Sequence, residues 1–227
     1  MCGRYTLTAA VEQLQSRFQF DTPVPEYAPS YNIAPSQEVL AVIRDEAHNR
    51  GGWLRWGLVP SWAKDPKVGY RMINARAESA AEKPSFRRAL RQRRCLILAD
   101  GYYEWQRHDG QKIPMYLRLR SREAFAFAGL WERWRDADGN TLVTCAILTT
   151  EANVWMQPVH HRMPVILEAE QEALWLDRSV TEPEALQPLL EPLHADMLEA
   201  YAVSPQVNSA RYNSPACMLP ADEAGAG

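Results

Sequence analysis

Cys2 offers the most distinctive chemistry in this 227-residue sequence. An initiator Met followed by a small residue is the usual substrate of methionine aminopeptidase, so we expect Cys2 to become the N-terminus. Its α-amine and thiol, with ordinary pKa values of about 8 and about 8.5, would then form a 1,2-aminothiol. Such a group attacks an aldehyde through nitrogen and closes to a thiazolidine through sulfur, or attacks an acyl group through sulfur alone. The alternative is a Cys2 that merely follows the start codon.

Two further segments carry groups suited to proton transfer and to positioning a substrate. Glu104 lies among aromatic residues in the run 100–105, an environment that raises a carboxyl pKa toward neutrality, as general acid–base catalysis requires. An ordinary Glu on an edge strand is the alternative. Asn74 and Arg76 are two residues apart in a strand-like run, so they project to one face. There the amide would orient a substrate and the guanidinium would bind phosphate.

A histidine pair followed by arginine, His160-His161-Arg162, places a proton-exchanging group beside a cation. Adjacent residues on an extended chain point to opposite faces, so the two histidines do not chelate one metal ion together. The four cysteines show neither CxxC spacing nor a disulfide pattern, and Cys95 and Cys145 lie in apolar runs typical of a core. We therefore expect no metal and no cofactor.

The charge of the chain is unevenly distributed. The net charge is -3, yet residues 71–94 carry eight basic and two acidic side chains, and residues 168–199 carry nine acidic and one basic. The basic stretch fits a nucleic-acid groove or a solvated face equally well, and the acidic stretch predicts helices that cover the sheet. Trp62 beside Lys64 suits base stacking, with packing against its own loop as the alternative.

The composition favours one globular domain. Hydrophobic residues make up 46% of the chain and charged residues 23%, and 227 residues are enough to bury a sizeable core. No apolar run approaches 18 residues and the N-terminus is not signal-like, so we expect a cytoplasmic protein with no membrane partner. Without repeats or a linker, the sequence predicts one domain over 1–220 and a flexible tail over 221–227.

Alternating apolar residues predict a structure rich in strands. The predicted strands span 3–7, 38–44, 53–59, 95–99, 113–120, 124–131 and 141–149. His108-Asp109-Gly110-Gln111 is predicted to be a hairpin turn. Thr8 would cap a helix after the first strand, and Pro84 would open a helix with a stripe of Arg87, Arg91 and Arg94. The fold class is therefore α+β, a single domain with a curved, barrel-like, mostly antiparallel sheet flanked by helices.

Six segments, in their order along the chain, resemble the motifs of the SRAP family, the SOS-response-associated peptidase-like proteins. They are Met1-Cys2-Gly3-Arg4, Tyr31-Asn32-Ile33-Ala34-Pro35, Trp56-Gly57-Leu58-Val59-Pro60, Ile73-Asn74-Ala75-Arg76-Ala77-Glu78, Asp100-Gly101-Tyr102-Tyr103-Glu104-Trp105 and His160-His161-Arg162-Met163-Pro164. Val203-Ser204 with Val207-Asn208 resembles the family's C-terminal motif. The resemblance covers nearly the whole chain, and six motifs in order are far more specific than one.

The resemblance implies the SRAP fold and the processing of abasic sites in single-stranded DNA. Cys2, exposed by removal of Met1, would form a thiazolidine crosslink with the ring-opened deoxyribose aldehyde and so protect the lesion. Asn74 would orient Cys2 or the sugar, Glu104 would be the acid–base group, and His160 would assist ring opening and adduct reversal. DNA would be bound by Arg4, Pro35, Trp62, Arg76, Trp105 and Arg162. A peptidase activity limited to Met1 is also implied.

The sequence also leads to expectations about the oligomeric state and the location of the protein, and it leaves two alternative functions open. We expect a monomer that associates with the nucleoid when it binds DNA. The family often has Asp after the motif histidine, whereas this chain has His161, so the hydrogen-bond partner of His160 stays open. An Ntn amidohydrolase, whose N-terminal thiol attacks an amide, is one alternative. A non-catalytic single-stranded DNA-binding protein is the other, and its binding would survive the loss of Cys2.

Overall fold

The computed structural model describes residues 2–46 and 48–223. The strands are β1 (Tyr5–Leu7), β2 (Ser30–Ile33), β3 (Glu38–Asp45), β4 (His48–Trp56), β5 (Asn74–Arg76), β6 (Arg94–Ala99), β7 (Gly101–His108), β8 (Gln111–Leu119), β9 (Phe125–Arg135), β10 (Thr141–Glu151), β11 (Arg162–Pro164), β12 (Ile166–Leu167) and β13 (Leu198–Ala202). The α-helices are α1 (Val11–Phe18), α2 (Ala77–Ala80), α3 (Arg87–Gln92), α4 (Ala169–Leu176) and α5 (Pro183–Leu186). Five 3₁₀ helices are η1 (Pro66–Arg71), η2 (Gln187–Leu190), η3 (Ala195–Met197), η4 (Pro205–Asn208) and η5 (Pro215–Met218).

The larger sheet closes into a five-stranded barrel. Its strands run in the order β10-β4-β3-β6-β9, and β9 pairs with β10 again to complete the circle. The β4–β10 pairing is parallel and the others are antiparallel. β5, β11 and β12 extend the barrel wall at its edges. The predicted α+β fold with a barrel-like, mostly antiparallel sheet is thus confirmed.

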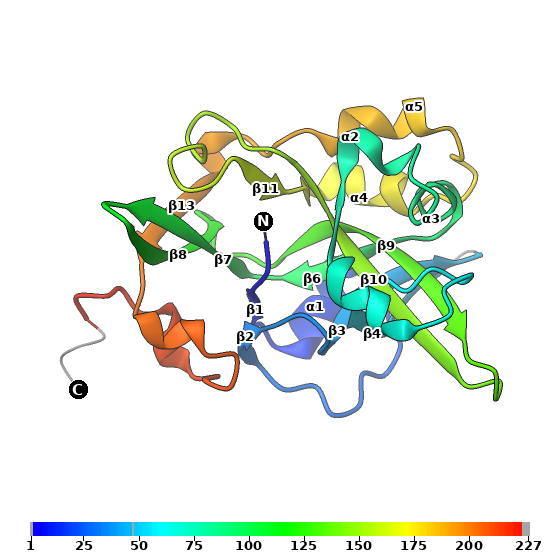
Figure 1. Ribbon diagram of the computed structural model, residues 1–227, viewed down its shortest axis with the longest axis horizontal. Helices are drawn as coiled ribbons and strands as arrows, with labels where there is room; N and C mark the ends of the chain where they lie inside the picture. The colour runs from blue at the N-terminus through cyan, green and yellow to red at the C-terminus, as the bar shows by residue number, and fades with distance from the viewer. Residues whose placement is uncertain (1, 47, 224–227) are drawn as a thin grey trace.

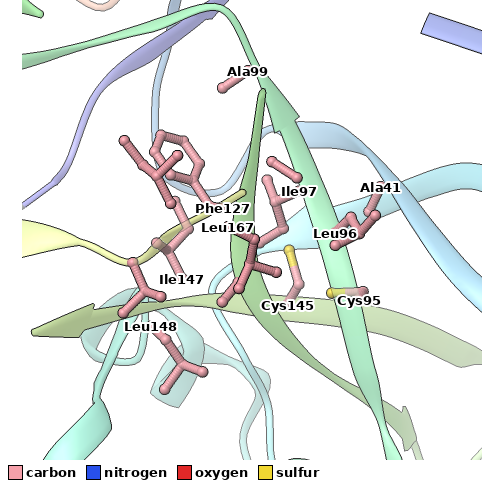
Figure 2. Packing of buried hydrophobic residues seen from close by; sticks show 14 of the residues in the cluster. Ala41, Cys95, Leu96, Ile97, Ala99, Phe127, Cys145, Ile147, Leu148 and Leu167 are labelled. Atoms are coloured by element: carbon pink, nitrogen blue, oxygen red, sulfur yellow. The ribbon is translucent and has the colours of Figure 1, made fainter. Parts of the chain in front are cut away.

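The barrel interior is filled by apolar side chains, as expected for so few strands. Every residue of β6 is buried. One face of the strand points into the barrel interior, and α3 and α4 pack on the other face. This explains why its sequence is a continuous apolar run rather than an alternating one. Figure 2 shows Cys95, Ile97, Phe127 and Cys145 gathered in this core, and both cysteines are fully buried, as predicted.

The smaller sheet carries the N-terminal segment. Its strand order is β13-β8-β7-β1-β2, and β1 lies near the middle of the molecule in Figure 1. The predicted hairpin turn is confirmed, since β7 and β8 pair through His108 and Gln111. Gly101 is required where β7 begins, because a Cβ there would lie 2.1 Å from the hydroxyl oxygen of Tyr116. This close approach lets Tyr116 reach Thr6 of β1 at 3.0 Å.

The helix after β1 begins differently from the prediction. α1 has Ala10 at its N-cap and no side-chain cap, so the predicted capping role of Thr8 is wrong. The hydroxyl of Thr8 instead donates to a carboxylate oxygen of Asp100 at 2.7 Å, and the same oxygen accepts from the Ala9 N–H at 3.1 Å. Asp100 also accepts a hydrogen bond from Thr6. A carboxylate 92 residues downstream therefore competes successfully for the Thr8 hydroxyl.

Arg94 was expected in an exposed basic stripe, and this prediction is wrong. Arg94 is 5% exposed and opens β6. Its guanidinium donates to the carbonyl oxygens of Leu90 at 2.8 Å and Arg91 at 3.0 Å, near the end of α3. It also donates to Trp175 at 2.6 Å, near the end of α4, and to Asp177. One cation therefore satisfies terminal carbonyls of two helices and opposes both dipoles.

The remaining segment predictions have mixed outcomes. The predicted strand over 53–59 is displaced, since β4 begins at His48 and ends at Trp56. α2 to α5 gather on one side of the barrel (Figure 1), and within the acidic stretch α4 packs on β6 and β9 as predicted. Of the predicted tail, Ala221–Glu223 form a turn and residues 224–227 lie outside the described part of the chain. No helix in that part is long and apolar enough to cross a membrane.

Candidate functional site

Cys2 lies buried just ahead of β1, held by its backbone. The side-chain amide of Asn74 donates to the carbonyl oxygen of Cys2 at 2.8 Å. Asn74 is itself fixed because β5 pairs in parallel with β10, opposite Ile147. The structure thus brings together two residues that are 72 positions apart, and β5 confirms the predicted strand from Asn74 to Arg76.

The Cys2 thiol is kept protonated by its surroundings. Cys2 has no exposed surface, and burial raises the pKa of its thiol well above the ordinary range. The negative charge of Glu104 raises this pKa further. A thiol in this state is a weak nucleophile at neutral pH, because the thiolate is the reactive form.

Glu104 is a buried carboxyl group on β7. It is 2% exposed, and burial raises its pKa above the ordinary value. Hydrogen bonding to the Trp105 backbone acts in the opposite direction but does not cancel the effect of burial. The carboxyl group therefore retains a proton to higher pH than an exposed glutamate, the property required of a general acid.

Tyr102 adds a hydroxyl group that sequence reasoning did not single out. It is fully buried on β7, and its hydroxyl has no hydrogen-bond partner among the described residues. Burial raises the pKa of Tyr102, and the proximity of two further acidic groups, Cys2 and Glu104, acts in the same direction. The side-chain oxygen of Asn74 is likewise buried without a hydrogen bond in this part of the chain. Buried polar atoms without protein partners are typical of a site that receives a ligand.

His160 is positioned by the backbone of the next strand. Its Nδ1 lies 3.0 Å from both the N–H and the carbonyl oxygen of Arg162, and its ring stacks on His161 with centroids 4.4 Å apart. Burial lowers the pKa of His160, and the positive charges of His161 and Arg162 act in the same direction. The imidazole therefore stays neutral to lower pH than an exposed histidine.

Arg4 joins the N-terminal segment to the C-terminal motif. Its guanidinium donates to the Asn32 side chain at 2.7 Å and to the Val207 carbonyl oxygen at 2.8 Å. It lies over the Trp105 ring at 5.9 Å, within cation–π range, and the Trp105 indole N–H donates to Asn208 at 2.7 Å. Trp105 is thus held as a partly buried platform at the edge of the site.

Asn32 organises the C-terminal segment, a role that sequence reasoning missed. Its side-chain amide donates to the carbonyl oxygens of Val207 at 3.2 Å, Ser209 at 3.0 Å and Tyr212 at 2.7 Å. Its position in a motif was the only signal available, because the residues it binds lie about 175 to 180 positions away. The motif around Asn32 is therefore explained by tertiary positioning as well as by any ligand contact.

Arg162 is committed to contacts inside the protein. It is 6% exposed and forms a two-pronged ion pair with Glu78, at 2.7 and 2.9 Å. It also donates to the Thr149 carbonyl oxygen at 2.5 Å. These bonds clamp β11 against β10 and α2. A phosphate contact of Arg162 stays a prediction, and this pairing works against it because the guanidinium already has a carboxylate partner.

The other residues predicted to bind DNA are more accessible. Arg76 is exposed at the end of β5, and Pro35 is partly buried after β2. Trp62 is 63% exposed, so it projects from its loop instead of packing against it. Their contacts with DNA remain predictions. Within the described residues, no group of three or more His, Cys, Asp or Glu side chains is arranged to hold a metal ion.

Comparisons with known proteins agree with this geometry. The family model for SOS response associated peptidase (SRAP) matches residues 1–210. The abasic site processing protein YoqW of Bacillus subtilis is 54% identical over 218 residues, which cover 95% of this chain and 97% of that protein. The abasic site processing protein HMCES of Rattus norvegicus is 33% identical over 98% of this chain and 76% of its own length.

A solved structure shows the same fold. The crystal structure of a protein from Bacteroides thetaiotaomicron superposes with a TM-score of 0.89 at 26% identity, covering 96% of this chain and 99% of that one. The motifs, the barrel and the matched family model therefore lead to one conclusion: this chain belongs to the SRAP family.

Proposed function

We propose that this protein processes abasic sites in single-stranded DNA by forming a covalent crosslink through Cys2. The observation that carries the proposal is the placement of Cys2, whose carbonyl oxygen is held by Asn74 at 2.8 Å beside the buried carboxyl group of Glu104. The names of relatives that match nearly the whole chain support it. Removal of Met1 by hydrolysis of its peptide bond is a required step, since the amine of Cys2 is otherwise part of an amide.

The reaction begins at nitrogen because the thiol of Cys2 resists deprotonation. The free α-amine attacks the aldehyde carbon of the ring-opened deoxyribose to give a carbinolamine, which loses water to give an imine. The sulfur then adds to the same carbon as the thiol proton is transferred to nitrogen, and this closes a thiazolidine. The overall change is one aldehyde and one aminothiol to one thiazolidine and one water, with no oxidant or cofactor consumed.

Glu104 and His160 catalyse different proton-transfer steps of this reaction. Glu104, with its raised pKa, protonates the hydroxyl group that leaves the carbinolamine. His160, with its lowered pKa, accepts a proton as the sugar ring opens and returns it when the adduct reverses. Asn74 keeps the backbone of Cys2 in place while both steps occur.

The DNA strand passes across the face that carries Arg4, Trp105 and Arg76. Trp105 provides a stacking surface, and exposed Arg76 provides a phosphate contact. The loops of Pro35 and Trp62 shape the path of the strand, and Arg162 is the weakest member of the predicted set because of its bond to Glu78. One chain supplies all of these residues, so a monomer suffices. Binding to chromosomal DNA would place the protein at the nucleoid.

A gel assay tests the proposal directly. Single-stranded DNA containing uracil is treated with uracil-DNA glycosylase and incubated with protein lacking Met1. We expect an adduct that survives heat and denaturant, and none with protein that retains Met1. A stable adduct with the Met1-blocked protein would refute the thiazolidine.

The same preparation separates the two rival classes. An N-terminal nucleophile hydrolase would release ammonia from free glutamine, whereas the proposed protein would not. A non-catalytic binding protein would retain DNA under native conditions and release all of it in denaturant. Either result with the mature protein would replace the proposed function.

A further inference from the structure

An arginine-lined groove of about 950 Å³ lies away from the site of Cys2. It is formed where β3 ends, where α3 meets β6, along the second half of β9 and by the segment after α4. None of these elements supplies a residue of the site described above. In Figure 1, α3 and β9 lie on the right of the view, whereas β1, β7 and β11 lie to their left.

The groove is strongly positive. Six arginines line it, and only Asp45 and Glu46 among its lining residues are acidic; the arginines are Arg44, Arg50, Arg93, Arg94, Arg133 and Arg178. Arg50 binds Asp45 at 2.9 Å, and Arg93 pairs with Glu132.

Two of these arginines present unmatched charge to solvent. Arg133 and Arg178 are exposed, and neither forms an ion pair within residues 2–46 and 48–223. Like charges also crowd one another at this place. Burial lowers the pKa of Arg93, and the neighbouring Arg88 and Arg133 lower it further. A bound anion would relieve this repulsion.

A second basic hollow adjoins the groove. Arg76 ends β5 beside the site, and the chain then runs through α2 to α3. A hollow of about 420 Å³ on α3 is lined by Arg87, Arg88 and Arg91, and Gln92 lines both this hollow and the groove. The positive charges of the groove therefore continue along α3 into the hollow.

We propose that the groove is an anchoring site for the sugar–phosphate backbone of the DNA strand whose lesion reacts at Cys2. The inference rests on the proposed function, and it adds a second position, distant from Cys2, at which the same strand is bound. Guanidinium groups bind phosphate through two parallel hydrogen bonds. Trp131, which lies under Arg93 at 5.5 Å and is partly exposed in the groove, adds a surface on which a base stacks.

The test uses two strand lengths and a double variant, Arg133→Glu with Arg178→Glu. Arg120→Glu is the matched control, because Arg120 is exposed just after β8 and lines neither the groove nor the hollow. Equilibrium binding is measured with an undamaged strand of about 30 nucleotides over a range of salt concentrations. The rate of crosslinking is measured with an abasic strand of about 5 nucleotides, which is too short to reach a second site.

The anchor predicts a loss confined to the long strand. The double variant should bind it at least about 5-fold more weakly, and its salt dependence should be shallower by about 1.4 log units per log unit of salt, about 0.7 for each lost phosphate contact. The short strand should crosslink at the parent rate. A second double variant, Arg133→Lys with Arg178→Lys, keeps both charges and should restore the salt dependence.

Several outcomes would overturn the anchor. One is a long-strand affinity and salt dependence of the double variant equal to those of Arg120→Glu. Another is slower crosslinking of the short strand, which would place the two arginines in the reaction site itself. If the parent protein forms no crosslink in the gel assay described above, the proposed function fails, while binding of the undamaged long strand still decides whether the anchor exists.

Discussion

All four cysteines of this protein are fully buried, and three of them, Cys2, Cys95 and Cys145, allow two regions of the molecule to be compared. Cys95 and Cys145 lie on the barrel strands β6 and β10, whereas Cys2 lies at the N-terminal site, although all three belong to one hydrophobic cluster. Burial raises the thiol pKa at all three positions. Neither burial nor pKa therefore distinguishes the reactive candidate from its structural counterparts.

The surroundings make the distinction. Burial is the one cause that raises the pKa of Cys145, and the neighbour that acts on Cys95 is Cys145 itself. Around Cys2 the neighbours are Glu104, Asn74 and Tyr102, and buried polar atoms of Asn74 and Tyr102 make no hydrogen bond within the described chain. The N-terminal site thus gathers a carboxyl group, an amide and a hydroxyl group around its thiol, and a substrate would satisfy their free polar atoms, whereas Tyr5 is the described residue that brings such a hydroxyl group toward Cys145.

The largest effect should come from exchanging sulfur for oxygen in each region. Cys2→Ser should abolish the stable adduct, because oxygen does not close the ring, while the free energy of unfolding stays close to that of the parent. Cys145→Ser should keep the adduct and lose about 1–3 kcal/mol of stability, because a hydroxyl would be buried among apolar side chains. Denaturing gels and urea unfolding measure the two quantities. A stable adduct with Cys2→Ser would show that the sulfur of Cys2 is not required for the crosslink.

Glu104→Gln should give the next largest effect, since it keeps the shape of the side chain and removes its proton. Crosslinking should slow by about 10²- to 10⁴-fold, with binding of an undamaged strand unchanged. The parent rate should fall as pH rises through the raised pKa of Glu104, and the variant should lack this dependence.

Stability provides an independent check on Glu104. A raised pKa in the folded state means that this group favours folding at low pH and opposes it as pH rises through the folded-state pKa. Glu104→Gln should therefore gain stability relative to the parent at alkaline pH. If the variant loses DNA binding together with its rate, or if the two stability curves stay parallel across pH, the role assigned to Glu104 is wrong.

Tyr102→Phe should slow crosslinking less than Glu104→Gln does, and it should not destabilise the fold. The hydroxyl has no hydrogen bond in the described chain, so its removal should leave the free energy of unfolding unchanged or slightly increased. Loss of one hydrogen bond to the substrate should slow crosslinking by about 2- to 10-fold. Tyr5→Phe is the matched control, because the Tyr5 hydroxyl is also buried without a partner in the described chain, and Cys145 acts on its pKa more strongly than Cys2 does. Equal crosslinking rates for the two variants would show that the Tyr102 hydroxyl makes no specific contact with the substrate.

The comparison also shows what the sequence was able to predict. Local patterns identified most strands and the β7–β8 turn, because alternation and turn residues act over a few positions. The closure of the barrel by parallel β4–β10 pairing was not predicted, since no local pattern encodes a partner about 90 residues away. Arg94 was misread for the same reason: its partners include carbonyl oxygens more than 80 positions downstream.

The site was predicted in its residue types better than in its contacts. Residue chemistry singled out Cys2, Asn74 and Glu104, and motif resemblance added their expected roles. The support given by Asn32 and Glu78 was missed because it depends on side chains that meet only after folding. Glu78 illustrates the limit, because it occupies the arginine that was expected to bind phosphate. A sequence motif indicates that its residues are required, but only the folded structure distinguishes residues that contact the substrate from residues that contact one another.

His161→Ala should give the smallest effect, because His161 acts on the site only through His160. Burial is the main cause of the lowered pKa of His160, and the stacked ring of His161 adds to it. The variant should therefore move this pKa upward, toward its ordinary value near 6.5. Because the pKa of His160 is lower in the folded state than in the unfolded state, the protein loses stability as pH falls from about 6.5 through the folded-state pKa. The variant should lose less stability over this range, because its two pKa values lie closer together.

The measurement for His161 is the rate at which purified crosslink reverses between pH 5 and pH 8, the range in which an imidazole changes charge. The acid limb of the variant should lie at higher pH than that of the parent, with rates that differ by less than about 5-fold, the most that one exposed charge contributes. His160→Ala, as the reference, should lose the limb altogether. A variant whose acid limb moves to lower pH would show that His161 stabilises the protonated ring of His160, as a hydrogen-bond acceptor would, instead of opposing its charge.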